Sequence, residues 1–180
     1  QRALALCQAL LVPALVYTYL NQDDPVVGGN APERIALRRA IAMGFSSDEF
    51  IKVFYGGQGL PANQILPPGT SGHDPALAAK SFHDPDAARA LLDRFGYRDR
   101  DGDGFREAPD GKPLTLVQSS TPDSDSREAD TLWLKNMAAI GIKMTVNSQP
   151  FNDLLKRSTA GQLMMFNLGF RASEPSGFNS

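Results

Sequence analysis

Two kinds of hydrophobic pattern follow one another along the chain. Short apolar or alternating runs predict strands at 13–20, 113–119, 142–147 and 163–169. Apolar residues that recur every three or four positions predict helices at 2–11, 32–45, 47–54, 85–95, 127–139 and 151–158. The last three strands alternate with helices, which is the order of a βαβαβ unit. The pattern therefore predicts an α/β fold, with a parallel or mixed sheet covered by helices.

Residues that favour helix ends support these boundaries. Asp84 and Pro85 suit the N-cap and first position of one helix, and Gly96 ends it. Ser46 and Glu49 have the spacing of a capping box. In the helix that begins at Pro32, the pattern places Ile35, Leu37, Ile41 and Ala42 inward and Arg34, Arg38 and Arg39 outward. The glycine- and proline-rich stretch 57–85 is expected to be irregular surface chain.

Length and composition suit one globular domain over residues 1–180. Of the 180 residues, 42% are hydrophobic and 21% are charged. The 18 basic and 20 acidic side chains give a net charge of −2 without a basic run, which argues against a nucleic-acid partner. The single cysteine, Cys7, cannot form an internal disulfide, and the apolar stretch 4–20 is too interrupted for a signal peptide or a membrane span. The start at Gln1 and the abrupt end suggest a piece of a longer protein.

An acidic loop at 99–110 imitates the calcium loop of an EF-hand. Four carboxylates and a glycine have its spacing: Asp99, Asp101, Asp103 and Asp110, with Gly104 in the turn. Pro109 and Pro113 prevent a following helix, and the next run alternates like a strand. The loop is thus either a weak calcium site or a glycine-rich turn that joins a helix to a strand.

Motifs of catalysis do not occur in the chain. His73 and His83 lie in predicted loops, and neither belongs to a zinc-binding pattern. There is no Gly-x-Ser-x-Gly nucleophile turn and no phosphate-binding loop. Acidic pairs such as Glu128 with Asp130 are expected to be solvated near a helix start. We therefore expect a protein that is not an enzyme and needs no cofactor.

An ordered series of short segments resembles the family 5 extracellular solute-binding proteins of the peptide-binding type. The resemblance is carried by residues 37–43, 46–51, 57–62, 65–69, 84–92, 95–97, 101–105, 110–114, 140–143 and 168–170. It implies most of the second lobe of a two-lobed protein with a type II periplasmic-binding-protein fold. The first lobe and the C-terminal return segment would be absent.

The resemblance also implies a function. Such a protein is the substrate-binding component of an ABC transporter; it would capture a peptide or related small solute between its lobes and deliver it to a membrane permease. It would be a monomer in the periplasm or outside the cell. Two other interpretations stay open at this point: a calcium-stabilised structural or adhesion module that uses 99–110, and the non-catalytic lobe of a hydrolase.

Candidate ligand residues follow from the sheet and from the resemblance. Ligands of α/β sheets bind beyond the carboxyl ends of strands, which points to 167–179. The candidates are Phe151, Asn167, Phe170, Arg171, Ser173 and Glu174. By resemblance, Phe151 and Phe170 occupy aromatic pocket positions, and Ser173 replaces the aspartate that holds a peptide's amino group, a role Glu174 could take. Ser158 and Asn167 replace basic residues that hold a peptide's carboxyl end in some members. Trp133 is expected in the core.

Overall fold

A computed structural model describes residues 14–62, 64–77 and 83–171. Its elements, in chain order, are β1 (Ala14–Leu20), α1 (Pro32–Gly44), α2 (Ser47–Phe54), α3 (Pro85–Arg94), β2 (Thr115–Ser120), α4 (Ser124–Ala139), β3 (Lys143–Ser148), α5 (Phe151–Thr159) and β4 (Met165–Arg171). These elements confirm the strands and helices predicted within the described residues, with shifts of one to three positions at most ends. The helix predicted at 2–11 lies outside the described residues.

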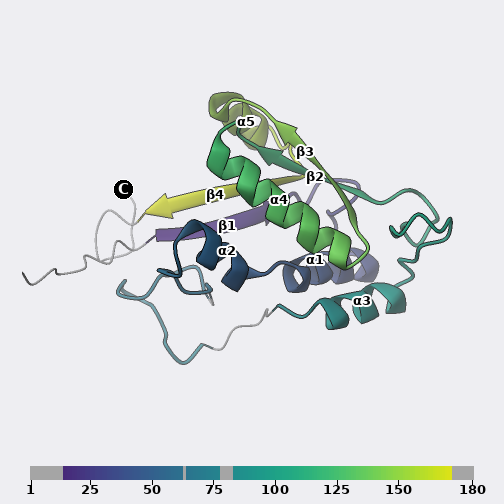
Figure 1. The fold of residues 1–180 in the computed structure, drawn as a ribbon, viewed down its shortest axis with the longest axis horizontal. Helices are drawn as coiled ribbons and strands as arrows, with labels where there is room; N and C mark the ends of the chain where they lie inside the picture. Colours follow the sequence, from purple (N-terminus) through teal and green to yellow (C-terminus); the bar gives the residue numbers. More distant parts are fainter. Residues whose placement is uncertain (1–13, 63, 78–82, 172–180) are drawn as a thin grey trace, which may run out of the picture.

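The four strands form one mixed sheet in the order β1-β4-β2-β3. Strand β2 pairs in parallel with β3 and with β4, whereas β1 pairs antiparallel with β4. Figure 1 shows the resulting arrangement, in which the helices cover a sheet made from distant parts of the chain. The parallel βαβαβ unit and its antiparallel fourth strand confirm the predicted mixed α/β architecture.

Helices pack on both faces of the sheet, because successive strand residues point in opposite directions. Met165 belongs to the larger core, which also contains residues of α1, α3 and α4. The next residue, Phe166, belongs to a smaller core with Leu154 of α5. One sheet face is therefore covered by α4, backed by α1 and α3, and the other by α5.

Trp133 of α4 joins the helices of the larger core. Its ring is 4% exposed and stacks on Phe45, with 4.1 Å between ring centroids. Phe45 lies at the end of α1 and also contacts Phe50 of α2, with 5.9 Å between ring centroids. Aromatic contacts therefore link α1, α2 and α4. The sequence-based assignment of Trp133 to the core is confirmed.

Details of α1 correct part of the prediction. Leu37 and Ile41 are buried as expected, but Ala42 is exposed, and Ala36 and Ala40 take its place in the core. Two of the arginines predicted to point outward instead hold the preceding loop: Arg34 donates to the carbonyl of Val26, and Arg38 donates to the carbonyls of Val27 and Gly29.

Helix α4 begins three residues earlier than predicted, because Asp123 caps it by accepting a hydrogen bond from the Ser126 N–H at 2.8 Å. Other caps match their predictions. Ser46 accepts from the Glu49 N–H, and Asp84 accepts from the Ala87 N–H. The Glu49 carboxylate pairs with Lys135 of α4 at 2.6 Å.

Candidate functional site

The carboxyl ends of the three parallel strands meet at one edge of the sheet. Strand β2 ends at Ser120 and β3 at Ser148, and the helices that follow them, α4 and α5, begin within four residues of those ends. Helix N-termini carry a partial positive charge and unpaired N–H groups. This edge, called here the carboxyl edge, therefore offers hydrogen-bond donors beside the strand ends, where ligands of open α/β sheets bind.

The turn after β2 holds a compact polar network. The Thr121 hydroxyl donates to the Asp123 carboxylate at 2.5 Å, and the Ser126 hydroxyl donates to it at 2.8 Å. These bonds, with the Ser126 N–H, hold the pKa of Asp123 far below its ordinary value. Asp123 is thus a fixed anion that neutralises the start of α4, so this turn is structural.

Aromatic side chains gather where α5 covers the carboxyl edge. Phe151, the first residue of α5, is 52% exposed, and its ring centroid lies 6.4 Å from that of buried Phe166. Tyr19 packs its edge against Phe166, also at 6.4 Å, and its hydroxyl donates to the Ser158 hydroxyl at 3.0 Å. We call Phe151, Phe166, Tyr19 and Ser158 the aromatic platform. It has an exposed ring and no charged member.

Arg157 lies next to the aromatic platform and is held by neutral groups. Its guanidinium donates to the Gln149 side chain at 2.9 Å and to the Gln162 carbonyl at 3.4 Å. Within the described residues it takes part in no salt bridge. Arg157 therefore keeps an uncompensated positive charge near the platform.

Among the predicted ligand residues, the structure describes the side chains of Phe151 and Asn167, which lie on opposite faces of the sheet. Asn167 accepts a hydrogen bond from the Thr18 hydroxyl at 2.6 Å, and it follows Phe166 directly on β4. It therefore points to the sheet face opposite the aromatic platform that contains Phe151. Phe170 and Arg171 close β4, opposite Leu15 and Ala14 of β1. Ser173 and Glu174 lie outside the described residues.

A buried acid at the carboxyl edge was not expected from the sequence. Asp130, in the second turn of α4, is only 7% exposed, although the acidic pattern predicted a solvated side chain. Burial raises its pKa, a hydrogen bond with Ser120 opposes that effect, and the nearby charge of Asp123 adds to it. No salt bridge within the described residues includes Asp130. Its hydrogen bond with Ser120 places the side chain beside the end of β2.

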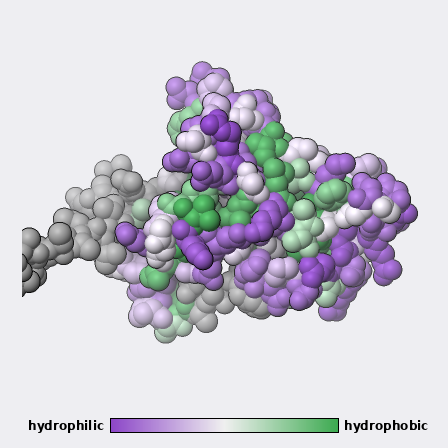
Figure 2. Space-filling view, in the orientation of Figure 1, coloured by the Kyte–Doolittle hydropathy of each residue, from purple (hydrophilic) through white to green (hydrophobic). Residues whose placement is uncertain are grey.

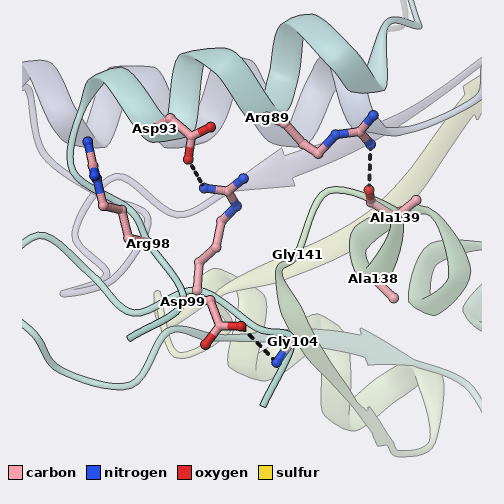
Figure 3. Close-up of a pocket in the computed structure, with 9 residues that line it drawn as sticks. Arg89, Asp93, Arg98, Asp99, Gly104, Ala138, Ala139 and Gly141 are labelled. Atoms are coloured by element: carbon pink, nitrogen blue, oxygen red, sulfur yellow. Dashed lines mark hydrogen bonds and ion pairs between the residues drawn. The ribbon is translucent and has the colours of Figure 1, made fainter. Parts of the chain in front are cut away.

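A second concave region lies at the opposite end of the parallel strands. This α3–α4 pocket has a volume of about 440 Å³ and is lined by Arg89, Asp93, Arg98, Asp99, Gly104, Arg106, Ala138, Ala139 and Gly141. Figure 3 shows Arg89 reaching from α3 to the carbonyl of Ala139 at the end of α4. Arg106 donates to the Ile140 carbonyl at 3.0 Å and pairs with Asp93 at 2.5 Å. Both guanidinium groups thus bind carbonyl groups at the end of α4. We call Arg89 and Arg106 the helix clamp, and this structural role accounts for the charged residues of the pocket.

The acidic loop forms a turn, and its carboxylates do not converge as the predicted set of four. Asp99 and Asp101 approach Glu107, with ligand atoms within 4.8 Å of one another. Asp103 instead accepts from the Phe105 N–H at 2.8 Å, and Asp110 pairs with Lys112 at 2.7 Å. Asp99 also accepts from the Gly102 and Gly104 N–H groups. The observed bonds are those of a glycine-rich turn, and the segment is mostly hydrophilic in Figure 2.

Within the described residues, the helices are all too short or too polar to cross a membrane.

Comparison with known proteins relates the sequence and the fold to extracellular solute-binding proteins. Residues 12–180 match the family model described as bacterial extracellular solute-binding proteins, family 5 middle region. The di/tripeptide-binding protein 2 of Pseudomonas aeruginosa is 33% identical over 142 residues, which are 78% of this chain and 23% of that protein.

Solved structures show the same fold. A periplasmic oligopeptide-binding protein of Thermotoga maritima aligns with a TM-score of 0.78 and 24% identity, over 91% of this chain and 31% of that chain. A second structure of the Thermotoga protein contains bound mannohexaose and aligns with a TM-score of 0.71, 21% identity, and 89% and 30% coverage. The oligopeptide-binding protein AppA of Bacillus subtilis, in complex with a nonapeptide, aligns with a TM-score of 0.79, 16% identity, and 93% and 32% coverage.

The chain spans less than a third of the length of each of these proteins. Its match to the family model, by contrast, covers nearly all of its own residues. Together with the mixed sheet and the exposed carboxyl edge, this match identifies the chain as a member of the family 5 bacterial extracellular solute-binding proteins.

Proposed function

We propose that residues 1–180 form one lobe of a two-lobed receptor for an ABC importer, which captures a peptide or related small solute and performs no chemistry. The observation that carries the proposal is the carboxyl edge, where the half-exposed ring of Phe151 stands beside the start of α5. The edge offers to a ligand an aromatic surface and the start of α5, which has no side-chain cap, and it needs a second surface to enclose the ligand. Closure of a second lobe over this edge would supply that enclosure.

The class of cargo is inferred from the relatives and from the side chains at the carboxyl edge. The names of the Pseudomonas and Bacillus proteins point to peptides, and the bound sugar in the Thermotoga protein supports a wider class of solutes. We infer that Phe151 stacks on the cargo, and that Asn167, Phe170, Arg171, Ser173 and Glu174 contribute further contacts from β4 and from the residues that follow it in the sequence. The uncharged Ser158 of the platform suits a neutral or apolar group of the cargo.

Location and partners follow from the family. Its members are extracellular solute-binding proteins. For this protein we propose a periplasmic or cell-surface location, a monomeric state and delivery of cargo to a membrane permease. A calcium-stabilised module and a hydrolase lobe are not favoured, because the family match accounts for nearly the whole chain, including the acidic loop.

The proposal is tested by native mass spectrometry of the complete protein as purified, followed by identification of the molecule released on denaturation. A released peptide or small solute is the expected result. An empty protein that also fails to bind any of a peptide and oligosaccharide panel would overturn the proposal.

The role of the aromatic platform is tested with Phe151→Ala in the complete protein. Because the ring is half exposed, its loss should weaken cargo binding about tenfold and leave the melting temperature nearly unchanged. Tyr55→Ala is the matched control, since Tyr55 is a 47% exposed aromatic residue outside the carboxyl edge. Equal cargo affinities for the two variants, measured by calorimetry, would remove Phe151 from the site.

A further inference from the structure

Buried polar side chains lie between β2 and α4, next to the carboxyl edge. Two of them, Gln118 and Ser120, belong to β2. Leu116 of β2 and Met165, the neighbour of Gln118 on β4, are part of the larger core that α4 covers. Because alternate residues of a strand share a face, Gln118 and Ser120 also point toward α4, which lies in front of the sheet in Figure 1.

The side-chain oxygen of Gln118 has no partner among the described residues. The Oε1 atom is buried and meets no hydrogen-bond donor there. The Nε2 atom of the same amide donates to the Ser119 carbonyl at 3.0 Å, which fixes the orientation of the amide, since the reverse orientation would bring two oxygens together. This bond also places the amide beside Ser119, one residue closer to the carboxyl edge. A buried acceptor without a donor is unfavourable, so a donor is needed at this point.

Asp130 of α4 is the acidic member of this polar region. Its carboxyl group is buried and accepts a hydrogen bond from Ser120. Ser120 stands two residues after Gln118 on the same face of β2, and the Gln118 amide extends toward that end of the strand. The fold therefore brings a buried carboxyl group and a buried, unpaired acceptor to adjacent positions between β2 and α4.

No cation within the described residues compensates Asp130. On its own helix, Arg127 is exposed, and Lys135 pairs with Glu49 of α2. Strand β2 carries no charged residue. The other cations on the elements packed against α4 are exposed or bonded to loop carbonyls: Arg34, Arg38 and Arg39 of α1, Lys52 of α2 and Lys143 of β3. The charged group that acts on Asp130 is another anion, Asp123.

We propose that a proton held by Asp130 joins its carboxyl group to the Gln118 Oε1. A protonated carboxyl group has one O–H donor and can still accept a hydrogen bond from Ser120. The proton supplies the donor that Gln118 lacks, and it removes a buried charge that no described cation compensates. Burial and the charge of Asp123, which raise the pKa of Asp130, favour the same state.

This hydrogen bond makes the contact between α4 and β2 sensitive to pH. Because the folded-state pKa of Asp130 is raised, the bond is present below that pKa and is lost as pH rises through it. Above it, a carboxylate and the Gln118 Oε1 face each other as two acceptors. The contact beside the carboxyl edge is therefore strongest in the protonated protein.

The distance between the two oxygens tests the proton directly. Two acceptors form a hydrogen bond only when a proton lies between them. A crystal structure of the complete protein, determined below the titration midpoint of Asp130, should place an Asp130 carboxyl oxygen within about 3.0 Å of the Gln118 Oε1. A separation beyond about 3.5 Å would overturn the proposal, and so would a water molecule or a metal ion between the two oxygens.

Carbon-13 NMR with labelled aspartate follows the Asp130 carboxyl group in the complete protein, and Asp130→Asn assigns its signal. Gln118→Met removes the acceptor and nearly keeps the side-chain volume. Because the protonated form then loses a hydrogen bond, the titration midpoint should fall by at least about one pH unit. An unchanged or higher midpoint contradicts the proposal.

Asn136→Leu is the matched control for this titration. Asn136 is a second buried amide of α4, and its Nδ2 also lacks a partner within the described residues. It stands six residues after Asp130, on a different side of the helix. The midpoint of Asp130 should therefore move by less than about 0.3 pH units in this variant. A shift as large as that of Gln118→Met would remove Gln118 as the specific partner.

A consequence for binding rests on the proposed function, which places cargo at the edge beside this contact. Above the titration midpoint, the two facing oxygens repel each other and weaken the hold of β2 on the second turn of α4. The cargo affinity of the wild type should fall about fivefold across that pH range, whereas Asp130→Asn keeps an N–H donor at every pH and should remove the dependence. Equal pH dependence in the two proteins contradicts the coupling. Absence of cargo binding at every pH would instead overturn the proposed function, while the oxygen distance and the titration still decide the proton.

Discussion

At the scale of single residues, Asp130 is a buried carboxyl group that forms no salt bridge within the described residues. Asp130 of α4 is buried, its carboxyl group accepts a hydrogen bond from Ser120, and the charge of Asp123 repels it. Burial of a charge without a cation is unfavourable, so the pKa of Asp130 rises. The side chain is therefore easier to bury protonated than ionised.

Asp130→Asn should reveal this cost as a pH-dependent gain in stability. Because the folded-state pKa is raised above the ordinary value of 3.8, the wild type loses stability as pH rises through the folded-state pKa. At pH 7 the variant should be more stable by about 1 kcal/mol. Chemical denaturation at pH 7 and pH 3 measures the effect, and the gain should vanish at pH 3. A gain that is the same at both values would show that ionisation is not its cause.

Arg106 is the second residue whose role is decided by its surroundings. It is nearly buried, it pairs with Asp93, and it donates to carbonyls of Ile140 and Tyr97. Arg106→Ala should lower the free energy of unfolding by about 2–3 kcal/mol, because it leaves buried carbonyls without a donor. Arg98 lines the same pocket, and its side chain forms no hydrogen bond or ion pair with the described residues, so Arg98→Ala should change stability by less than about 0.5 kcal/mol. Similar losses in the two variants, by urea denaturation, would contradict the helix clamp.

At the scale of elements, glycines with positive φ end α4 and α5 and set the entry into β3 and β4. Gly141 follows α4 with φ 73°, and Gly161 follows α5 with φ 68°. A Cβ at Gly141 would lie 3.1 Å from the Arg106 Nε, whereas one at Gly161 would meet nothing within 4 Å. The two helix ends share a backbone conformation and differ in what packs against them.

Alanine at these two positions should separate conformation from packing. Gly161→Ala should cost about 1 kcal/mol, the penalty of a left-handed conformation for a residue with a Cβ. Gly141→Ala should cost about 1 kcal/mol more, because it also displaces Arg106 from the Ile140 carbonyl. Thermal and chemical denaturation measure the difference. Equal costs would mean that Arg106 moves aside without loss.

At the scale of the whole molecule, the proposed function assigns half of a binding surface to the described residues. The carboxyl edge carries exposed Phe151 and the starts of α4 and α5. Affinity depends on enclosure of the ligand, since clefts bury most of a ligand's surface. An isolated lobe is therefore expected to hold cargo poorly.

Residues 1–180 by themselves should bind cargo at least about 100-fold more weakly than the complete protein, because they make about half of the buried contacts. Isothermal calorimetry with the solute identified from the complete protein measures both affinities. Circular dichroism of the isolated chain is the control for folding. Comparable affinities would place the whole site within these residues and contradict the two-lobe proposal.

The sequence by itself determined the order and type of the described helices and strands, because each element carries its own periodicity, its caps and its turn residues. Asp84 with Pro85, Ser46 and the helix-ending glycines act within a few residues, so their effects can be predicted locally. The same local signals, in order, also pointed to the family. They placed Phe151 at the start of α5, beside the carboxyl edge.

Only the tertiary structure decided which side chains share a face and which charges are buried. Asn167 and Phe151 were predicted for one site, yet strand alternation puts them on opposite faces of the sheet. Asp130 is buried beside Ser120 at the end of β2, and Arg106 donates to a carbonyl at a helix end 34 residues away in sequence. These results depend on register and on contacts between distant segments, which no local pattern specifies.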